Sequence, residues 1–505
     1  MDFLGQLFSN LVLGFSTVFA PINMMYCIIG VLVGTLVGVL PGIGPQATIA
    51  MLLPVTFNLP PVGAIIMLAG IYYGSQYGGS TTSILMNLPG EAASVITCLD
   101  GYQMAKQGRG GQALAIAAIG SFFAGTVGTI LIALFGPPLA QIALSFGAAE
   151  YFSLMVMALI LASVLGSGSL IKSLASIIMG LIFGIVGTDV NTGMSRFTFD
   201  ASGLADGIAF GALAMGLFGL SDILMNLDEG QDSVSRDVLT KKITHLYPSW
   251  PDIKISTGPI IRGTAVGAVC GSLAGGGATI ASFSSYVLEK RIAKNPEDFG
   301  KGAIQGVAGP EAANNAAAQC AFIPMLTLGI PSTATMAIIL GALTILGIAP
   351  GPRVMTQYPD LFWGLVASMW IGNALLVVIN LPLVGLWVKF LMVPYRFLFP
   401  AIVTFMAIGI YSLNRSFIDC YLTVFFGFLG YVFQKLKCDL APLVLAFVLG
   451  PMIEENLRRA LLFSRGDPTV FFTKPISAGL LIISALLLVF MFLSAVRKKR
   501  KVVLE

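Results

Sequence analysis

Long apolar runs separated by short polar segments make up most of this chain. From Phe3 to Gly90 the sequence contains no Asp, Glu, Lys or Arg. At about 20 apolar residues per helical crossing, that stretch alone is long enough for three or four membrane spans. Strands of a transmembrane barrel are shorter and alternate in hydropathy, so the pattern predicts helices.

We predict an all-α polytopic membrane protein with about twelve transmembrane helices in two inverted structural repeats, some helices being broken or re-entrant. The apolar runs that predict these spans cover residues 22–44, 45–58, 62–88, 112–136, 150–166, 170–188, 203–226, 259–288, 303–350, 361–393, 397–413, 417–434, 438–452 and 474–496.

Composition agrees with this pattern. Of the 505 residues, 56% are hydrophobic and only 10% are charged, against about 25% charged in soluble domains. So much apolar surface does not fit inside one soluble core. Disordered chains and nucleic-acid-binding proteins carry far more charge, which excludes both classes. The net charge of +4 is too small to indicate a partner.

The charged residues are concentrated in a few segments and divide the chain into domains. They gather in residues 228–257, in residues 289–301 and in a basic tail at Arg497–Lys501. Basic loops of membrane proteins lie in the cytoplasm, so we expect loop 289–301 and the C-terminus there. The predicted units are a first repeat (1–227), a cytoplasmic polar linker (228–257), a second repeat (258–473), and a final transmembrane helix with a cytoplasmic tail (474–505).

The two halves share spaced glycines. In the first half they are Gly30, Gly34, Gly38 and Gly42, and in the second Gly263, Gly267, Gly271 and Gly275. Ala47-Thr48-Ile49-Ala50 then recurs as Ala278-Thr279-Ile280-Ala281. Glycine at every fourth position lets another helix approach closely. Because the loop at 58–61 is uncharged while its counterpart at 289–301 is basic, the repeats are predicted to be inverted.

Four segments rich in Gly, Pro, Ser and Thr interrupt the apolar runs at Leu40–Gln46, Gly74–Ser83, Gly275–Gly277 and Gly329–Thr335. Irregular backbone within a membrane persists only where protein or a polar cavity satisfies it. Pro331 suits a first helical turn, and Ser or Thr suits the cap before it. A helix N-terminus presents amide donors and partial positive charge to an anion such as a carboxylate. Plain helix packing and interhelical Ser/Thr hydrogen bonds are the alternative interpretation.

Two sets of candidate site residues follow from these segments. The predicted substrate-binding residues are Gly42, Gly44, Gln46, Gly79, Ser80, Thr81, Gly275, Gly277, Pro331, Ser332 and Thr333. The predicted ion-coupling residues are Thr48, Thr82, Thr279, Thr335, Glu311 and Asn315. Hydroxyl and carbonyl oxygens suit Na⁺, which is a hard cation. For Glu311, an ion or substrate role and a cap at a helix start remain equal alternatives.

Few residues offer catalytic or metal chemistry. Acids near apolar runs are Glu91, Asp189, Asp206, Asp222, Glu311 and Asp419. The single histidine, His245, lies in the charged linker, and the six cysteines form no CxxC pair. We therefore expect no enzyme activity, no catalytic residues, no metal site and no cofactor beyond a coupling ion, Na⁺ or H⁺.

Four blocks together resemble a known family: Gly34–Gln46, Tyr73–Gly90 with Gly101-Tyr102, Gly309–Asn315 and Gly329–Thr335. They are similar to the large membrane subunit of tripartite tricarboxylate transporters. The resemblance implies a carrier for carboxylates in the bacterial inner membrane. It also implies two partners, a small four-helix membrane subunit and a periplasmic solute-binding protein that delivers the substrate. The chain has no GxxxxGK[ST] nucleotide-binding motif, so a sodium or proton gradient is the expected energy source.

The sequence therefore predicts a secondary active transporter subunit that imports a di- or tricarboxylate by alternating access. An anion channel or passive exporter without gradient coupling is the main alternative. An intramembrane enzyme and a scaffold that only docks a binding protein are weaker ones.

Overall fold

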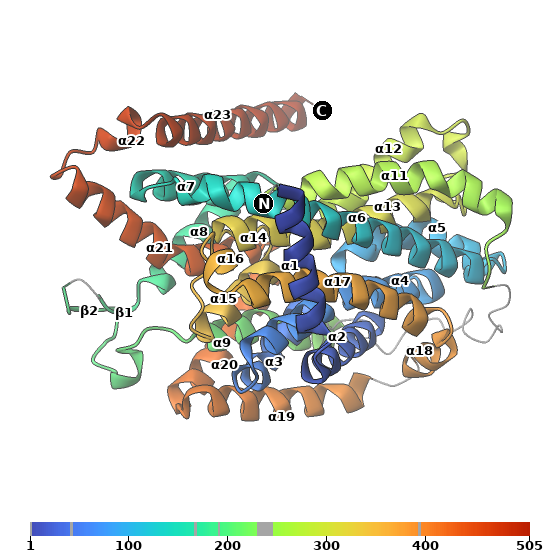
Figure 1. Ribbon diagram of the computed structural model, residues 1–505, viewed down its shortest axis with the longest axis horizontal. Coiled ribbons are helices and arrows are strands. Elements are labelled where there is room, and N and C mark those ends of the chain that lie inside the picture. The colour runs from blue at the N-terminus through green and yellow to red at the C-terminus, as the bar shows by residue number, and fades with distance from the viewer. Residues whose placement is uncertain are drawn as a thin grey trace.

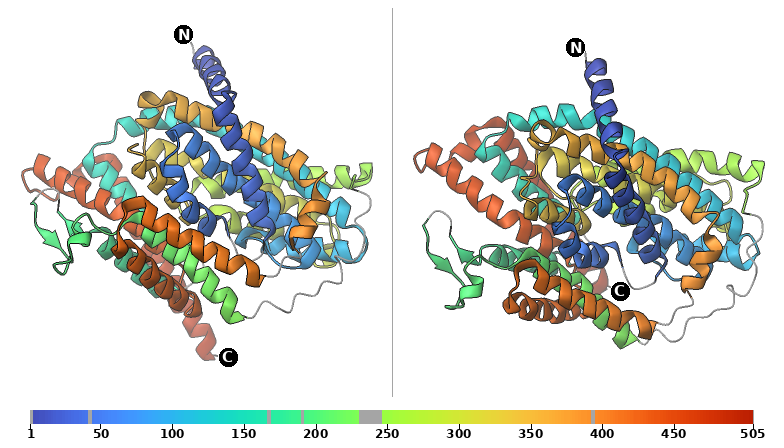
Figure 2. Two further views of the ribbon diagram at one scale, coloured as in Figure 1. Left: turned by 90° about the horizontal axis from the view of Figure 1, so that it is seen from below. Right: turned by 60° about the horizontal axis from the view of Figure 1, so that its bottom comes forward.

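The structure is a computed structural model that describes residues 3–40, 44–165, 169–189, 192–229, 246–391 and 395–504. Most of these residues are helical, and most of the helices lie side by side along the long axis of the molecule (Figure 1). The N-terminal end of α1 projects from the body (Figure 2). The all-helical class predicted from the apolar runs is thus confirmed.

The regular elements follow in chain order. They are α1 (Phe3–Val18), α2 (Pro21–Val39), α3 (Pro45–Phe57), α4 (Pro61–Met86), η1 (Ala92–Ser94), α5 (Val95–Lys106), α6 (Gly110–Leu144), α7 (Ala148–Leu165), α8 (Leu170–Gly184), β1 (Gly187–Thr188), β2 (Ser195–Arg196), η2 (Ser202–Leu204), α9 (Phe210–Ala214), η3 (Met215–Leu220), α10 (Ser221–Glu229), α11 (Trp250–Ser272), α12 (Gly277–Ile292), η5 (Pro296–Asp298), α13 (Gln305–Cys320), α14 (Phe322–Leu328), α15 (Ala334–Ile345), α16 (Val354–Gln357), α17 (Pro359–Asn380), α18 (Val384–Leu391), α19 (Tyr395–Asn414), α20 (Phe417–Lys435), α21 (Ala441–Phe463), α22 (Val470–Thr473) and α23 (Pro475–Leu504).

Several helices have the length and composition of membrane spans. Among the described residues, five helical segments qualify: Pro21–Val39, Gly110–Leu144, Phe210–Asp228, Pro359–Asn380 and Phe417–Lys435. Shorter apolar helices such as α3, α8 and α15 accompany them. The count of about twelve crossings stays a prediction, because several apolar helices are shorter than the bilayer core.

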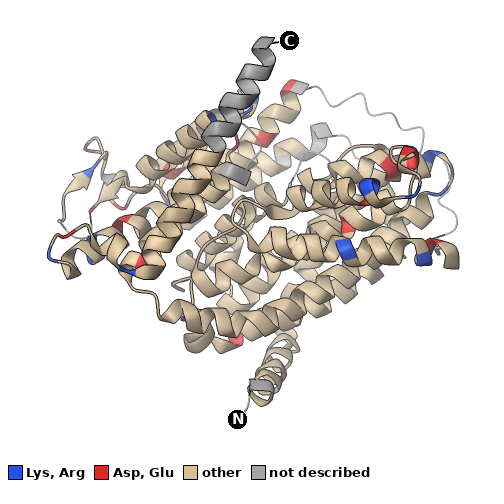
Figure 3. Cartoon of the chain, turned by 90° about the horizontal axis from the view of Figure 1, so that it is seen from above, with Lys and Arg blue, Asp and Glu red and all other residues tan. Residues whose placement is uncertain are grey.

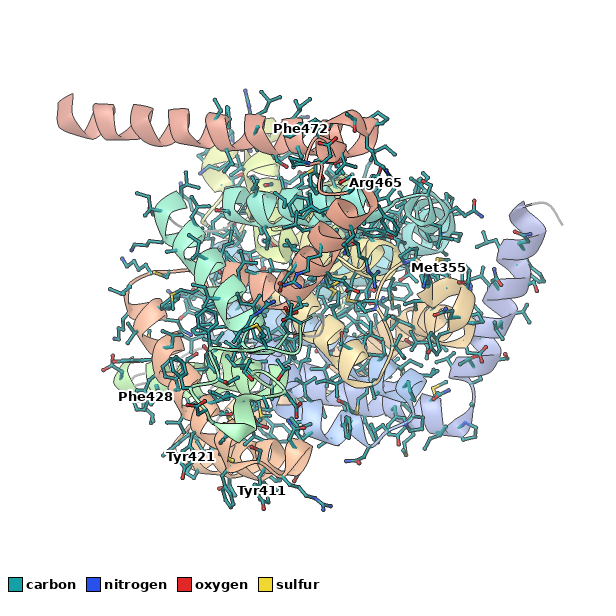
Figure 4. The ribbon with its side chains drawn as sticks, turned by 90° about the vertical axis from the view of Figure 1, so that its left-hand side faces the viewer. Met355, Tyr411, Tyr421, Phe428, Arg465 and Phe472 are labelled. Carbon is teal, nitrogen blue, oxygen red and sulfur yellow. The ribbon has the colours of Figure 1, made fainter. Side chains whose placement is uncertain are left out.

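Charge and apolar exposure are distributed as a bilayer requires. Lys, Arg, Asp and Glu gather at two opposite ends of the molecule, and few of the described residues between them are charged (Figure 3). Large apolar side chains face outward along the sides, as Tyr421 and Phe428 of α20 do (Figure 4). These two side chains are 73% and 58% exposed. An apolar lateral surface between two charged ends fits lipid contact.

The glycine rows are packing faces, as predicted. A side chain on Gly34 of α2 would lie 2.6 Å from the carbonyl oxygen of Ile71 in α4. In the second half, a side chain on Gly267 of α11 would lie 2.2 Å from the carbonyl oxygen of Ala313 in α13. Each row therefore brings its own helix, α2 or α11, against the second helix that follows it in the chain, α4 or α13.

Contacts of α6 and α17 fix the directions of these helix pairs. Helix α6 is parallel to α13, because Gly120 contacts Ala308 and Gly128, further along α6, contacts Gln319, further along α13. It is antiparallel to α17, because Gly125 contacts Asn373 whereas Gly136, further along α6, contacts the earlier residue Phe362. Helix α2 is parallel to α17, because Cys27 is bonded to Ser368 and Thr35, further along α2, is bonded to Asn380, further along α17. Since α2 is parallel to α17 and α13 is antiparallel to it, α2 and α4 run opposite to α11 and α13.

Three sequence predictions about local structure are wrong. Residues Gly74–Ser83 do not interrupt a helix, because α4 continues from Pro61 to Met86. Pro331 is not in a first helical turn, since α15 begins at Ala334. Residues 228–257 are not all linker: α10 extends to Glu229 and α11 begins at Trp250.

Candidate functional site

A cavity of about 650 Å³ lies where four chain interruptions meet. Its lining comes from Gly44–Gln46, Pro89–Ala92, Gly275–Ile280 and Ser332–Thr335, together with side chains of α4, α10, α20 and α21. Two of the interruptions belong to the first half of the chain and two to the second.

Each interruption ends where a helix begins. Helix α3 begins at Pro45, α12 at Gly277 and α15 at Ala334, while the turn η1 at Ala92 leads into α5. The first amides of a helix have no acceptor within it, and the aligned peptide dipoles give each start about half a positive charge. The starts of three α-helices and of the η1 turn around one cavity can favour an anion there without a basic side chain.

The two interruptions of the second half are joined to each other. The amide of Gly275 donates to the carbonyl oxygen of Ser332 at 2.7 Å. Gly275 and Gly277 have φ values of 79° and 57°, a left-handed conformation that favours glycine. The hydroxyl of Thr333 caps α15 by accepting a hydrogen bond from the amide of Met336 at 3.2 Å. These bonds hold irregular backbone in place beside the cavity.

In the first half, glycines allow the corresponding segment to pack against α2 and α4. A side chain on Gly90 would lie 2.0 Å from the carbonyl oxygen of Gly38 and 2.6 Å from the Cα of Gly79. The hydroxyl of Thr82 donates to the carbonyl oxygen of Val39 at 2.7 Å, at the end of α2. Gly79 and Thr82 therefore support the interruption from outside the cavity lining.

The segment that corresponds to Gly329–Ala334 is Asn87–Ala92. Asn87 ends α4 and Gly329 ends α14 in the left-handed conformation, with φ values of 58° and 72°. A proline follows two residues later in both segments, at Pro89 and Pro331, and then a new helical segment begins. Gly79–Thr82 lie within α4 and are helical, so they are not the counterpart of the interruption at Gly329–Ala334.

The structure brings together about half of the predicted site residues. Those that line the cavity are Gly44, Gln46, Gly275, Gly277, Thr279, Ser332, Thr333 and Thr335. Those that do not line it are Thr48, Gly79, Ser80, Thr81, Thr82, Glu311, Asn315 and Pro331. Gly42 lies outside the described residues. The substrate and ion roles of all these residues remain predictions.

Glu311 is fully buried in a polar network separate from the cavity lining. Its carboxylate accepts hydrogen bonds from the hydroxyls of Ser80, at 2.5 Å, and Thr97, and from the amide of Asn314 at 3.4 Å. The side-chain amide of Asn315 donates to Ser121 at 2.8 Å. These bonds connect α13 with α4, α5 and α6.

Gln76 and Glu91 line the cavity but were not among the predicted binding residues, although Glu91 was one of the acids noted near apolar runs. The side-chain amide of Gln76 donates to Glu91 Oε2 at 2.9 Å. Three buried side-chain oxygens in the lining have no hydrogen-bond partner among the described residues: Gln76 Oε1, Glu91 Oε1 and Ser332 Oγ. Matching Asn87–Ala92 with Gly329–Ala334 in the sequence would have drawn attention to Glu91.

The charge of the lining is one-sided. The cavity contains Glu91, Asp222 and Asp439, and no Lys, Arg or His among its described lining residues. A second cavity of about 530 Å³ shares Asp222 and Asp439 with the first and adds Lys437. Gln434 lines both cavities and donates to Asp222 at 2.8 Å. This second cavity is a candidate passage to the first.

Apolar helices around a polar cavity at helix ends define the molecule as a polytopic membrane transport protein. The chain belongs to the tripartite tricarboxylate transporter TctA family, whose model matches residues 24–445. It is accordingly a subunit of a tricarboxylate transporter, and its family is one of transporters and not of enzymes.

Two proteins of Agrobacterium vitis are similar to the chain. One, described as an uncharacterized 52.8 kDa protein in the TAR-I ttuC' 3' region, is 56% identical over 495 residues, covering 98% of each chain. The other, an uncharacterized protein in the TAR-II ttuC' 3' region, is 58% identical over 234 residues, which are 46% of this chain and 97% of that protein. No solved structure matches the chain.

Proposed function

We propose that this subunit binds a di- or tricarboxylate in the 650 Å³ cavity and imports it by alternating access, driven by a cation gradient. The observation that carries the proposal is the meeting of the starts of α3, α5 with its η1 turn, α12 and α15 at one cavity. A carboxylate there accepts hydrogen bonds from backbone amides and from hydroxyls such as that of Ser332.

The opposite directions of the two halves support alternating access. Helices α2 and α4 run against α11 and α13, and each half contributes two interruptions to the cavity. Inverted repeats with discontinuous helices at a shared central site are a common build of secondary transporters. A movement of one half relative to the other would expose the cavity first on one side and then on the other.

The family match supports a proposal for the partners, and the basic tail supports one for the location. A tripartite transporter has two further components, which we propose to be a small membrane subunit and a periplasmic solute-binding protein. We place the chain in a bacterial inner membrane with the basic tail Arg497–Lys501 in the cytoplasm, in accordance with the positive-inside rule.

Uptake by proteoliposomes tests this function. Vesicles would contain both membrane subunits, and the solute-binding protein would be added with labelled citrate under an imposed Na⁺ or H⁺ gradient. We expect citrate to accumulate above its outside concentration and to leave the vesicles when the gradient is dissipated. Flux that only equilibrates citrate, whatever the gradient, would favour the anion channel or passive exporter instead.

A further inference from the structure

We propose that Gln76 and Glu91 bind the cation that accompanies the carboxylate, within the same cavity. This inference rests on the proposed transport function and assigns the cation to a position that differs from the Thr, Asn and Glu311 set predicted from the sequence.

The geometry of the pair leaves two acceptors without a donor. Gln76 Nε2 donates to Glu91 Oε2 at 2.9 Å, and this bond fixes which end of the amide faces the carboxylate. Gln76 Oε1 and Glu91 Oε1 are then buried oxygens with no partner among the described residues, and the Gln76 side chain is only 1% exposed. Buried polar atoms are nearly always satisfied, so these two oxygens call for a donor or a cation from outside the described chain, and one cation between them satisfies both.

The position of Glu91 is held by its neighbours. The hydroxyl of Ser94 accepts a hydrogen bond from the backbone amide of Glu91 at 3.3 Å and donates one to its backbone carbonyl oxygen at 2.9 Å. A side chain on Gly79 would lie 2.9 Å from Glu91 Cγ, so the carboxylate side chain rests directly against the backbone of α4. A site whose ligands are fixed before binding loses little conformational freedom when the cation arrives.

The charge of the cavity gives an independent reason for a cation. Glu91 and Asp222 are acids of the cavity lining, and the described lining has no basic side chain. A substrate with two or three negative charges adds to this excess, and the helix starts offset only part of it at about half a charge each. One positive charge beside Glu91 lowers the repulsion, so binding of the cation and of the carboxylate should strengthen each other.

Glu311, by contrast, does not need a cation. Its carboxylate already accepts hydrogen bonds from Ser80, Thr97 and Asn314, and it does not line the cavity. A Na⁺ ion and a proton both supply the single positive charge that the pair of free oxygens at Gln76 and Glu91 lacks, and the experiment separates the two sources.

The test measures citrate affinity in the detergent-purified membrane subunits with this chain at full length. Citrate Kd is measured against Na⁺ concentration at fixed pH, with choline keeping ionic strength constant, and then against pH at fixed Na⁺. In the unaltered protein we expect citrate Kd to fall up to about tenfold for each tenfold rise in the coupling cation, whether Na⁺ or H⁺. The Glu91→Gln variant should lose this dependence, and Gln76→Met should shift it to higher cation concentration.

Two further variants complete the test. Glu311→Gln serves as the matched buried acid outside the cavity and should retain the cation dependence, as should Glu455→Gln on the surface of α21. Dependence that survives in Glu91→Gln, or that disappears only in Glu311→Gln, would overturn the assignment. If Glu91→Gln does not fold, an unshifted Gln76→Met variant has the same consequence.

The outcomes for the unaltered protein separate this inference from the function on which it rests. Citrate binding with no dependence on either cation refutes the cation site and leaves the carboxylate site intact. If neither citrate, succinate nor tartrate binds under any of these conditions, the proposed carboxylate function itself fails.

Discussion

The hydroxyl of Ser332 offers a direct test of the carboxylate site through the substitution Ser332→Ala. This side chain is fully buried, lines the cavity, and has no hydrogen-bond partner among the described residues. Removing it breaks no bond within the described part of the protein, so the free energy of unfolding should change little or rise slightly. If the hydroxyl donates to a bound carboxylate, citrate binding should weaken.

The expected magnitude follows from the chemistry of that bond. A hydrogen bond to a charged group contributes about 1.5–3 kcal/mol. Because about 1.4 kcal/mol corresponds to a tenfold change in affinity, the citrate Kd should rise about ten- to hundredfold. The apparent melting temperature should stay close to that of the unaltered protein.

Ser285→Ala is the matched control. Ser285 is also fully buried and without a partner among the described residues, but it lies further along α12 and does not line the cavity. Both variants would be assayed by isothermal calorimetry with citrate and by thermal unfolding in detergent. Equal citrate affinity in Ser332→Ala and Ser285→Ala would refute the placement of the substrate beside Ser332.

Three further predictions concern the architecture. Gly267→Val should lower the free energy of unfolding by about 1–3 kcal/mol or more, because its Cβ would lie 2.2 Å from the Ala313 carbonyl oxygen. Gly479→Val is the control, since a Cβ there has nothing within 4 Å, and equal melting temperatures of the two variants would contradict the packing. Asp100→Ala should lower the free energy of unfolding by about 1–3 kcal/mol, since Asp100 Oδ1 accepts hydrogen bonds from the backbone amides of Gly300, Gly302 and Ala303 at 2.8–2.9 Å and the buried amide of Ala303 would lose its acceptor. An unchanged melting temperature would argue against this contact. Thr333→Val should destabilise the start of α15 by about 1 kcal/mol through loss of its cap and also weaken citrate binding, whereas a change in stability alone would remove Thr333 from the site.

Part of this structure can be read from the sequence because it depends on local chemistry. The spaced glycines predict close helix contacts, and both rows make them, at Gly34 with Ile71 and at Gly267 with Ala313. Glycines at 275 and 277 predict an interruption, and their positive φ values show why glycine is required there. Such features follow from the missing side chain and need no knowledge of the rest of the fold.

The continuity of α4 could not be predicted in this way. Its polar residues suggested an interruption, yet Ser80 bonds to Gln76 and Glu311 and Thr82 bonds to Val39, so a regular helix satisfies them. Two of these partners, Glu311 and Val39, belong to other helices, and polarity alone does not distinguish an interrupted helix from one that faces buried acceptors. The correspondence between Asn87–Ala92 and Gly329–Ala334 was also not predicted, because the two segments share a backbone conformation more than residue types.

The most direct measurement of the central claim is a cryo-electron microscopy map of the transporter with citrate bound. The account predicts ligand density in the 650 Å³ cavity, in contact with the starts of α12 and α15 at Gly277 and Thr333 and close to Ser332. Citrate density outside this cavity, beside Glu311 or in the second cavity alone, would contradict the claim that the interrupted helices of the two halves form the carboxylate site.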